Sequence, residues 1–268
     1  MGADIKQLRT RIKSVDSTLH LTKAMGLVAS SKIRRATESM NKGKQYASAL
    51  IDTVSTLASY DECKKSPYMA KRDEGETLLV VVAGDRGLAG GYNANIFRSL
   101  RELGDVRIIP VGKRACERFG GKLILAERFS YADAMEIAEL ACSGFAEGKY
   151  RRVGILCTEY ISLMSQEARI RWLLPLERTE AQSGGVSAIF EPDEITVLNS
   201  VIPEYVAGML VSSVKESFAC EVAARRVAMD NAGKNAQEMI DRLGLEYNRA
   251  RQGAITQEIT EIVAGSGM

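Results

Sequence analysis

A glycine-rich turn after an apolar run is the first feature of this chain that could do chemistry. GDRGLAGGYN at 84–93 follows TLLVVVAG at 77–84, and nucleotide-binding proteins hold phosphate on the backbone amides of such turns. The glycines recur as GxxGxxG rather than GxGxxG, and no Gly-Lys pair continues into Ser or Thr as a P-loop requires. We therefore expect a tight turn that presents Asp85 and Arg86 to a partner. A nucleotide-binding α/β enzyme with a coiled-coil extension remains the alternative.

Other residues that could form an active site or a metal site are scattered along the chain. The single histidine, His20, has no second histidine near it, and the chain contains no GxSxG elbow and no DxDxDG calcium loop. The five cysteines form no CxxC pair, so neither a zinc site nor a disulfide framework is expected. They are Cys63, Cys116, Cys142, Cys157 and Cys220. We predict no catalytic residues, no metal and no cofactor.

Two long terminal helices are predicted to surround the glycine turn. All five prolines lie between residues 67 and 203, so the main helix breaker is missing from both ends. From Ile5 to Leu57, steps alternating between three and four residues give sixteen positions, of which thirteen are apolar. This spacing is typical of a coiled-coil seam and predicts a helix over 1–60. Thr22, Gly26 and Ala29 are small seam residues that would let a partner helix approach closely.

The C-terminal segment offers that partner helix. Apolar residues recur every three or four positions between Val214 and Ala254, which predicts a second coiled-coil helix over 193–268. We expect the two helices to pair in antiparallel orientation. The fold class is then α/β, with a long antiparallel coiled coil of the N- and C-terminal helices and a small central α/β domain over 75–190.

The central domain is predicted to contain a mostly parallel sheet with right-handed crossovers. One helix is expected to be capped by Asn93 and to stop at Gly104, and another to begin with a capping box of Ser130 and Asp133. A short helix is expected at 113–120. The predicted strands are 77–84, 106–112, 122–129, 151–160 and 168–177.

Composition and charge limit the function classes further. The chain has 268 residues, 46% apolar and 26% charged, with a net charge of +2, as expected of a soluble globular protein. No secretory signal core is present, and no segment approaches the roughly 20 apolar residues of a membrane span. Residues 1–45 contain ten Lys or Arg against three acidic residues. This bias predicts a surface for an acidic protein partner; a nucleic-acid adaptor is the alternative, although interleaved aromatic residues are missing.

Several motifs, in their order along the chain, resemble the gamma subunits of F-type ATP synthases. The resemblance covers essentially the full length and is most specific in the C-terminal motif. The motifs are LTKAMGLVASSKIRRA at 21–36, GDRGLAGGYN at 84–93, MSQ at 164–166, LLPL at 173–176, FEPD at 190–193, and MIDRLGLEYNRARQGAITQEITEIVAG at 239–265. This sequence departs from the family at Gly26, where a longer and usually charged residue is typical, and at Ala89, where the family usually has Cys.

The resemblance implies a central rotor shaft. Such a subunit couples transmembrane ion flow to ATP synthesis or hydrolysis at the beta-subunit catalytic sites by rotation, without catalytic residues of its own. Its implied partners are the alpha3-beta3 ring, the epsilon subunit and the c ring of the membrane sector, with no nucleic acid and no small-molecule substrate. The implied location is the cytoplasmic face of the cell membrane, as a peripheral part of the complex.

The resemblance also implies partner-binding residues. Matching motif positions contact the beta subunit in the family, and one position faces the c ring. The beta-facing matches are Arg251, Gln252, Thr256 and Glu258 in the C-terminal motif, and Arg86, Lys23 and Met25 near the acidic lever segment of beta. The match that faces the c ring is Tyr205.

Overall fold

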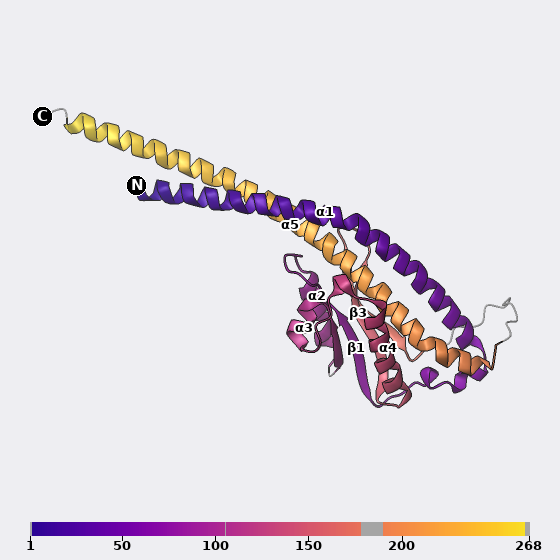
Figure 1. The fold of residues 1–268 in the computed structure, drawn as a ribbon. Helices are drawn as coiled ribbons and strands as arrows, with labels where there is room; N and C mark the ends of the chain where they lie inside the picture. The colour runs from indigo at the N-terminus through magenta and orange to yellow at the C-terminus, as the bar shows by residue number, and fades with distance from the viewer. Residues whose placement is uncertain (1, 105, 178–189, 266–268) are drawn as a thin grey trace. The chain divides into compact units, whose positions relative to one another are not determined.

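Two long helices at the chain ends dominate the structure, a computed structural model that describes residues 2–104, 106–177 and 190–265 (Figure 1). Helix α1 spans Gly2–Ser59 and α5 spans Glu194–Gly265. At about 1.5 Å per residue these helices are roughly 90 and 110 Å long. Both predicted terminal helices are confirmed; residues 266–268 of the predicted C-terminal helix lie outside the described part of the chain.

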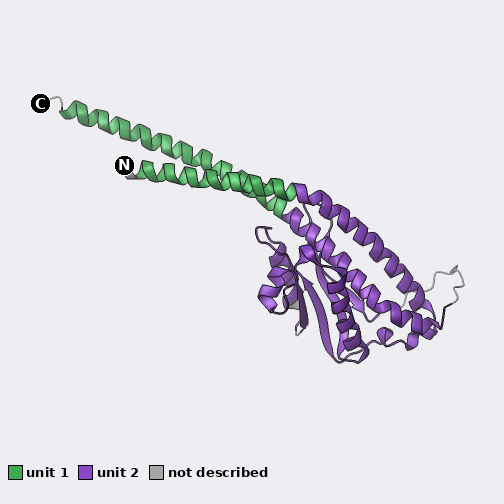
Figure 2. Cartoon of the chain, viewed as in Figure 1, with its two compact units in different colours: residues 1–30, 225–268 green, residues 31–224 purple. Residues whose placement is uncertain are grey.

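The chain divides into two compact units, of which one combines the two ends of the sequence and the other is the continuous segment between them (Figure 2). Unit 1 comprises residues 1–30 and 225–268, and unit 2 comprises residues 31–224. The division therefore cuts through both long helices, whereas the predicted domains follow the helix ends. The predicted domain boundaries stay a prediction.

In unit 1, α1 and α5 pack against each other through small residues. A Cβ atom placed on Gly26 would lie 3.7 Å from the Met229 Cβ, and one on Gly233 would lie 3.6 Å from the Thr22 hydroxyl oxygen. The pairing is antiparallel because moving back along α1 from Gly26 to Thr22 moves forward along α5 from Met229 to Gly233. Every seam position predicted between Ile5 and Leu57 is buried or half-buried, which confirms the seam.

In unit 2 the two helices continue to pair, and the sheet packs beside them. A Cβ on Gly43 would lie 3.4 Å from Ser212, while one on Gly208 would overlap the Leu50 side chain and lie 2.9 Å from the Tyr46 ring. Small residues on both helices thus allow the close approach expected from the sequence.

The sheet has four strands in the order β2-β1-β3-β4. Strand β1 is parallel to both β2 and β3, whereas β4 returns antiparallel to β3. Pro110 lies in the edge strand β2, where a missing amide donor is tolerated. The mostly parallel sheet is therefore confirmed, with one antiparallel strand. The strands are β1 Glu76–Val82, β2 Arg107–Val111, β3 Tyr150–Tyr160 and β4 Gln166–Leu174.

Helices cover both faces of this sheet (Figure 1). Leu78, Val80 and Val82 of β1 pack in a core with α1, α4 and α5, while Leu79 and Val81 pack in a core with α2 and α3. Successive side chains of a strand point to opposite faces, so the continuous apolar run of β1 reflects burial on both. The shorter helices are α2 Tyr92–Ser99, α3 Lys113–Phe119 and α4 Tyr131–Ala146, with 3-10 turns at Glu62–Lys65, Pro67–Met69, Leu100–Glu102 and Ala126–Arg128.

Two local predictions for the central domain are wrong, whereas the short helix expected at 113–120 and one capping box are confirmed. Residues 122–129 form no strand but end in the 3-10 turn, because Asp85 takes the backbone amides of Ala126 and Glu127 that a strand would need. Asn93 lies inside α2, whose N-cap is Gly91. The capping box of Ser130 and Asp133 is present at the start of α4.

Helix α5 also departs from the expectation that no segment approaches a membrane span. It contains an 18-residue window with a mean hydropathy of 1.4, half of which is buried inside the protein. Length and composition alone make this weak evidence for a span, since the core helix of a soluble protein meets the same criterion. Leu198, Ile202 and Leu210 in the first half of α5 are fully buried in the core, which accounts for its apolar character.

Two glycine-to-alanine substitutions are predicted to change stability in opposite directions. Gly26→Ala adds a methyl group that finds ordinary contacts with Met229 and Asp230, and it should stabilise α1 by about 0.5–1 kcal/mol. Gly144→Ala in α4 places its methyl carbon inside van der Waals distance of the buried Tyr150 ring, and overpacking should destabilise the chain by about 1–3 kcal/mol. Thermal unfolding of both variants measures this; a shift of the same sign in both would contradict the packing.

Candidate functional site

The carboxyl edge of the parallel strands is where ligands bind in doubly wound α/β folds. In this chain α5 lies across that edge and directs three polar side chains into it. Glu216, Ser217 and Glu221 are each almost completely buried there, although they belong to an otherwise apolar part of α5. The groups that would receive a ligand are therefore engaged by the chain itself.

The glycine turn binds one of these side chains. The Glu221 carboxylate accepts hydrogen bonds from the amides of Asp85 and Arg86, each at 3.3 Å, and the Asn93 side-chain oxygen accepts the Gly84 amide at 2.9 Å. A Cβ on Gly84 would lie 2.9 Å from the Glu221 carboxyl carbon, so this close approach requires glycine. The amides that would hold a phosphate in the nucleotide-binding alternative are thus occupied by an internal carboxylate.

Ser217 closes the edge one turn earlier along α5. Its hydroxyl oxygen accepts the Thr158 amide at 2.9 Å, and its carbonyl accepts the Tyr92 hydroxyl at 2.9 Å. Burial, and then the charge of Glu221, raise the pKa of Tyr92 well above its ordinary value. Tyr92 therefore remains a protonated donor throughout the neutral range.

Glu216 joins three elements at the end of β3. Its carboxylate lies 2.6 Å from the Lys44 ammonium on α1 and 3.3 Å from the Arg171 guanidinium on β4. It also accepts the Tyr160 amide at 3.0 Å. The Glu216 side chain has no exposed surface, whereas Lys44 and Arg171 are partly exposed. This residue was not predicted from the sequence; the signal was an acidic residue at a buried position of an apolar helix.

Asp85 and Arg86 of the glycine turn were both predicted to face a partner, but only Arg86 points outward. Asp85 turns inward and accepts the amides of Lys113, Ala126 and Glu127, so the expectation that it faces a partner is wrong. The Arg86 side chain is 60% exposed and lies 3.2 Å from the Glu127 carboxylate. The hydrogen bond from Lys32 lowers the pKa of Glu127, aided by the charge of Arg86.

Leu88, near the tip of the same turn, is an unusual exposed residue that was not predicted from the sequence. Its φ is +60°, a left-handed conformation uncommon outside glycine, and its apolar side chain is 62% exposed. Residues held in such conformations concentrate at functional sites. An apolar residue in a glycine-rich turn was the available signal.

The predicted site residues in the N-terminal motif lie on α1 within unit 1. Lys23 is exposed and Met25 is half-buried. Three large apolar side chains near them are exposed although α1 has a buried seam on its other side: Leu21, Leu27 and Val28. Together they make an apolar and basic face that α5 does not cover.

The predicted residues of the C-terminal motif lie together near the end of α5. Arg251, Gln252, Thr256 and Glu258 are all exposed. Gln252 and Thr256 are four residues apart and share one face of the helix, and the Thr256 hydroxyl donates to the Gln252 carbonyl at 3.0 Å. Large apolar side chains are exposed along the same last turns, namely Ile255, Ile259, Ile262 and Val263.

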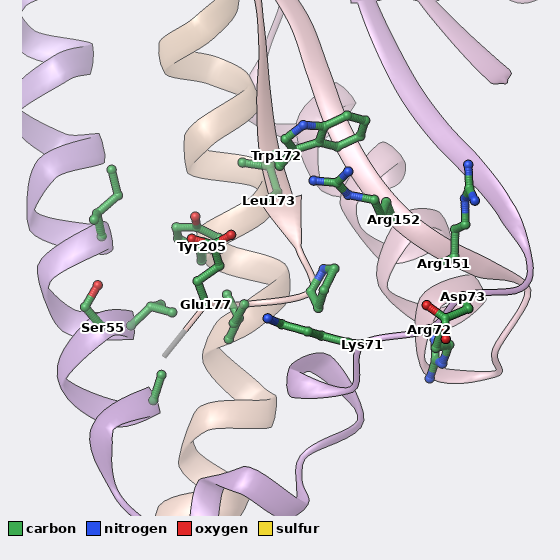
Figure 3. A pocket seen from close by; sticks show the side chains of 15 residues that line it. Ser55, Lys71, Arg72, Asp73, Arg151, Arg152, Trp172, Leu173, Glu177 and Tyr205 are labelled. Carbon is green, nitrogen blue, oxygen red and sulfur yellow. The ribbon is translucent and has the colours of Figure 1, made fainter. Parts of the chain in front are cut away.

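Tyr205 lies apart from these surfaces, within unit 2. It is only 8% exposed and belongs to the main core, and burial raises the pKa of its hydroxyl. It lines a pocket of about 460 Å³, together with Lys71, Arg152 and Trp172 (Figure 3). The structure therefore presents little of the Tyr205 surface to a partner.

This pocket has basic residues, but most of them are engaged by the chain itself. Arg152 stacks over the Trp172 ring at 4.0 Å, Arg151 donates to the Thr77 hydroxyl at 3.1 Å, and Arg72 donates to the Phe145 and Tyr150 carbonyls. In Figure 3 Arg72 and Arg151 point away from Lys71 and Tyr205. No cluster of potential metal ligands occurs among the described residues.

The fold and these surfaces define a protein with two long, paired terminal helices and an α/β layer whose ligand edge is closed by its own helix. Residues 4–267 match the protein family described as ATP synthase. The chain is 41% identical to the ATP synthase gamma chain of Ruminococcus albus over 98% of both chains. It is 34% identical, over 99% of both chains, to the sodium-ion-specific ATP synthase gamma chain of Acetobacterium woodii. The chain belongs to the ATP synthase gamma chain family.

A solved structure supports the fold at lower sequence identity. The chain is similar to one from the Euglena gracilis mitochondrial ATP synthase, described as OSCP/F1/c-ring in rotational state 3, with a TM-score of 0.67. The two are 20% identical, and the match covers 98% of this chain and 94% of the other. The predicted α/β layer with two long terminal helices is thus confirmed.

Asp85→Ala is predicted to destabilise the chain by about 2 kcal/mol, because it leaves three backbone amides without their acceptor and water can replace only part of the loss. Thermal or urea unfolding of the isolated chain measures the change. Asp73→Ala, at an exposed position, is the matched control and should stay within about 0.5 kcal/mol of the parent chain. Equal stabilities for the two variants would contradict the inward role of Asp85.

Proposed function

We propose that this chain is the central rotor shaft of an F-type ATP synthase and couples transmembrane ion flow to ATP synthesis or hydrolysis by rotation. One observation carries the proposal. The last turns of α5 expose Ile255, Ile259, Ile262 and Val263, whereas the seam earlier in the same helix is buried. Exposed apolar surface of this kind marks a site where another protein binds.

The proposed surrounding protein is the alpha3-beta3 ring. Gln252 and Thr256 supply hydrogen-bonding groups on the exposed face of α5, and Arg251 and Glu258 supply flanking charges of opposite sign. We propose that these four residues contact the beta subunits. The family membership and the exposure of all four side chains support this assignment.

A second beta contact is proposed for the basic face of α1 and for the glycine turn. Lys23 lies beside exposed apolar residues, and Arg86 lies beside the exposed Leu88. Both surfaces combine a positive charge with uncovered apolar area, which suits an acidic amphipathic segment such as the proposed lever of beta. Met25, half-buried, would contribute apolar contact at its edge.

The other proposed partners are the epsilon subunit and the c ring, at the cytoplasmic face of the membrane. Because little of Tyr205 is exposed, we propose that the c ring contacts this residue inside the pocket that it lines. The Euglena gracilis structure is described as containing OSCP, F1 and a c ring, which supports this set of partners. Neither a nucleic acid nor a small-molecule substrate is part of the proposal.

The proposed mechanism needs no catalytic group in this chain. A shaft whose faces differ makes different contacts with each beta subunit at a given angle. Only such a difference in contact free energy can shift a beta site between tight and loose binding of nucleotide. Here the differing surfaces are the end of α5, where Gln252 and Thr256 lie among exposed apolar residues, and the basic face of α1 around Lys23.

Replacing both Gln252 and Thr256 by Ala should impair coupling without unfolding the subunit. Each lost hydrogen bond to beta is worth about 0.5–1.5 kcal/mol, and unpaired partner groups add to the cost. Thermal unfolding of the isolated chain should stay unchanged because both side chains are exposed. ATP turnover and ion pumping of the assembled complex should both fall.

The control for this double variant is Gln237→Ala, an exposed glutamine of α5 whose amide bonds to Asp241 within the helix. It should leave turnover and pumping at the parent level. A destabilised double variant, or a fully active complex containing it, would contradict the proposed beta contact.

A further prediction is that the isolated chain does not turn over ATP, because the amides of its glycine turn already bind Glu221. Steady-state phosphate release by the purified chain measures this. Turnover at rates comparable with the assembled complex would overturn the proposal and favour the nucleotide-binding alternative.

A further inference from the structure

The charge cluster around Glu216 takes no part in the proposed partner contacts. Its members come from three different elements of unit 2: Lys44 from α1, Glu216 from α5, and Arg171 from β4. The cluster thus connects both long helices to the sheet at a single carboxylate. That carboxylate has no exposed surface, and it also accepts the amide of Tyr160 at the end of β3.

Stability alone is a poor reason to bury such a group. Removing a carboxylate from water is costly, and well-packed apolar residues of similar volume often serve a core equally well. Apolar contacts, however, are not directional. Ion pairs at 2.6 and 3.3 Å with a buried carboxylate fix both distance and direction.

We propose that Glu216 is a torsional anchor that, through Lys44 and Arg171, locks the two long helices to the α/β layer so that torque passes between them without slipping. This inference rests on the proposed rotor function and adds a positioning role inside the shaft. The Lys44 ammonium pairs with Oε1 of Glu216 and the Arg171 guanidinium with Oε2. Rotation of α5 about its axis would therefore strain these two ion pairs.

The neighbouring polar contacts of α5 support this assignment. Ser217 holds the Thr158 amide of β3, and Glu221 holds the glycine turn after β1. Both of these contacts tie α5 to the α/β layer. Glu216 adds the ion pair to α1, so its loss should loosen the shaft as a whole.

The test measures the angular stiffness of the shaft in the assembled complex. A bead is attached to the thiol introduced by Arg98→Cys at an exposed position of α2, and the ring is fixed to a surface. All five native cysteines are buried, so labelling within this chain is selective. Thermal fluctuation of the bead angle is recorded while the complex pauses without ATP, and its variance is inversely proportional to the torsional stiffness.

We expect Glu216→Gln and Lys44→Met each to raise the angular variance about twofold, because a buried ion pair gives way to a weaker neutral contact or to none. Lys44→Arg, which keeps the charge, should restore the parent variance. The matched controls are Lys42→Met on α1 and Glu238→Gln on α5, both at exposed positions, and both should leave the variance unchanged.

Lys44→Met is the decisive variant because it is the one expected to fold normally. Lys44 is partly exposed, and Arg171 still neutralises the buried Glu216 carboxylate when Lys44 is replaced. A parent-like variance in Lys44→Met, or a rise that Lys44→Arg fails to reverse, would overturn the anchor. The rotor function is tested separately in the parent complex, where ATP should make the bead rotate. A parent complex that rotates while Lys44→Met keeps the parent variance would overturn the anchor alone.

Discussion

The packing of α5 against α1 on one side and against the sheet on the other is the constraint on which this structure depends. One continuous helix serves as half of a coiled coil in unit 1 and as a core helix in unit 2. Small residues make the first role possible, since Gly233 of α5 and Gly26 of α1 allow close approach. The second role, packing against the sheet, explains why α5 has buried acidic and hydroxyl side chains among its apolar residues, since these side chains bind backbone amides of the α/β layer.

Those polar side chains also occupy the carboxyl edge of the parallel strands, where doubly wound α/β folds bind their ligands. Glu221 occupies the amides of the glycine turn, and Ser217 and Glu216 occupy the amides at the end of β3. The layer thereby gains a firm attachment to the long helix. In the proposed rotor this attachment is useful, because the α/β layer would have to pass force to the helices.

Much of the fold was predictable because its strongest signals are periodic. The seam from Ile5 to Leu57 and the apolar run of β1 depend on local spacing, which the sequence displays directly. The errors arose where a distant group decides local structure. Residues 122–129 have the composition of a strand, yet the Asp85 carboxylate captures two of their amides. The buried positions of Glu216 and Glu221 likewise depend on the sheet meeting α5, which no local pattern reveals.

The proposed site residues were predicted in a different way, since they came from resemblance to a family that the comparisons confirm, and they stay a prediction. Their exposure agrees with partner contacts for Arg251, Gln252, Thr256 and Glu258, while Tyr205 is buried. Leu88 was missed because its left-handed backbone angle forms only in the folded turn, and the sequence shows only an apolar residue among glycines. Exposure and backbone conformation thus add information that motif matching lacks.

Direct observation of rotation is the measurement that tests the central claim. The ring of the purified complex is fixed to a surface, and a bead is attached to the thiol introduced by Arg98→Cys. We predict that ATP drives the bead in one direction with three equally spaced pauses per turn. Hydrolysis of ATP at the full rate while the bead shows only unbiased thermal motion would contradict the rotor function.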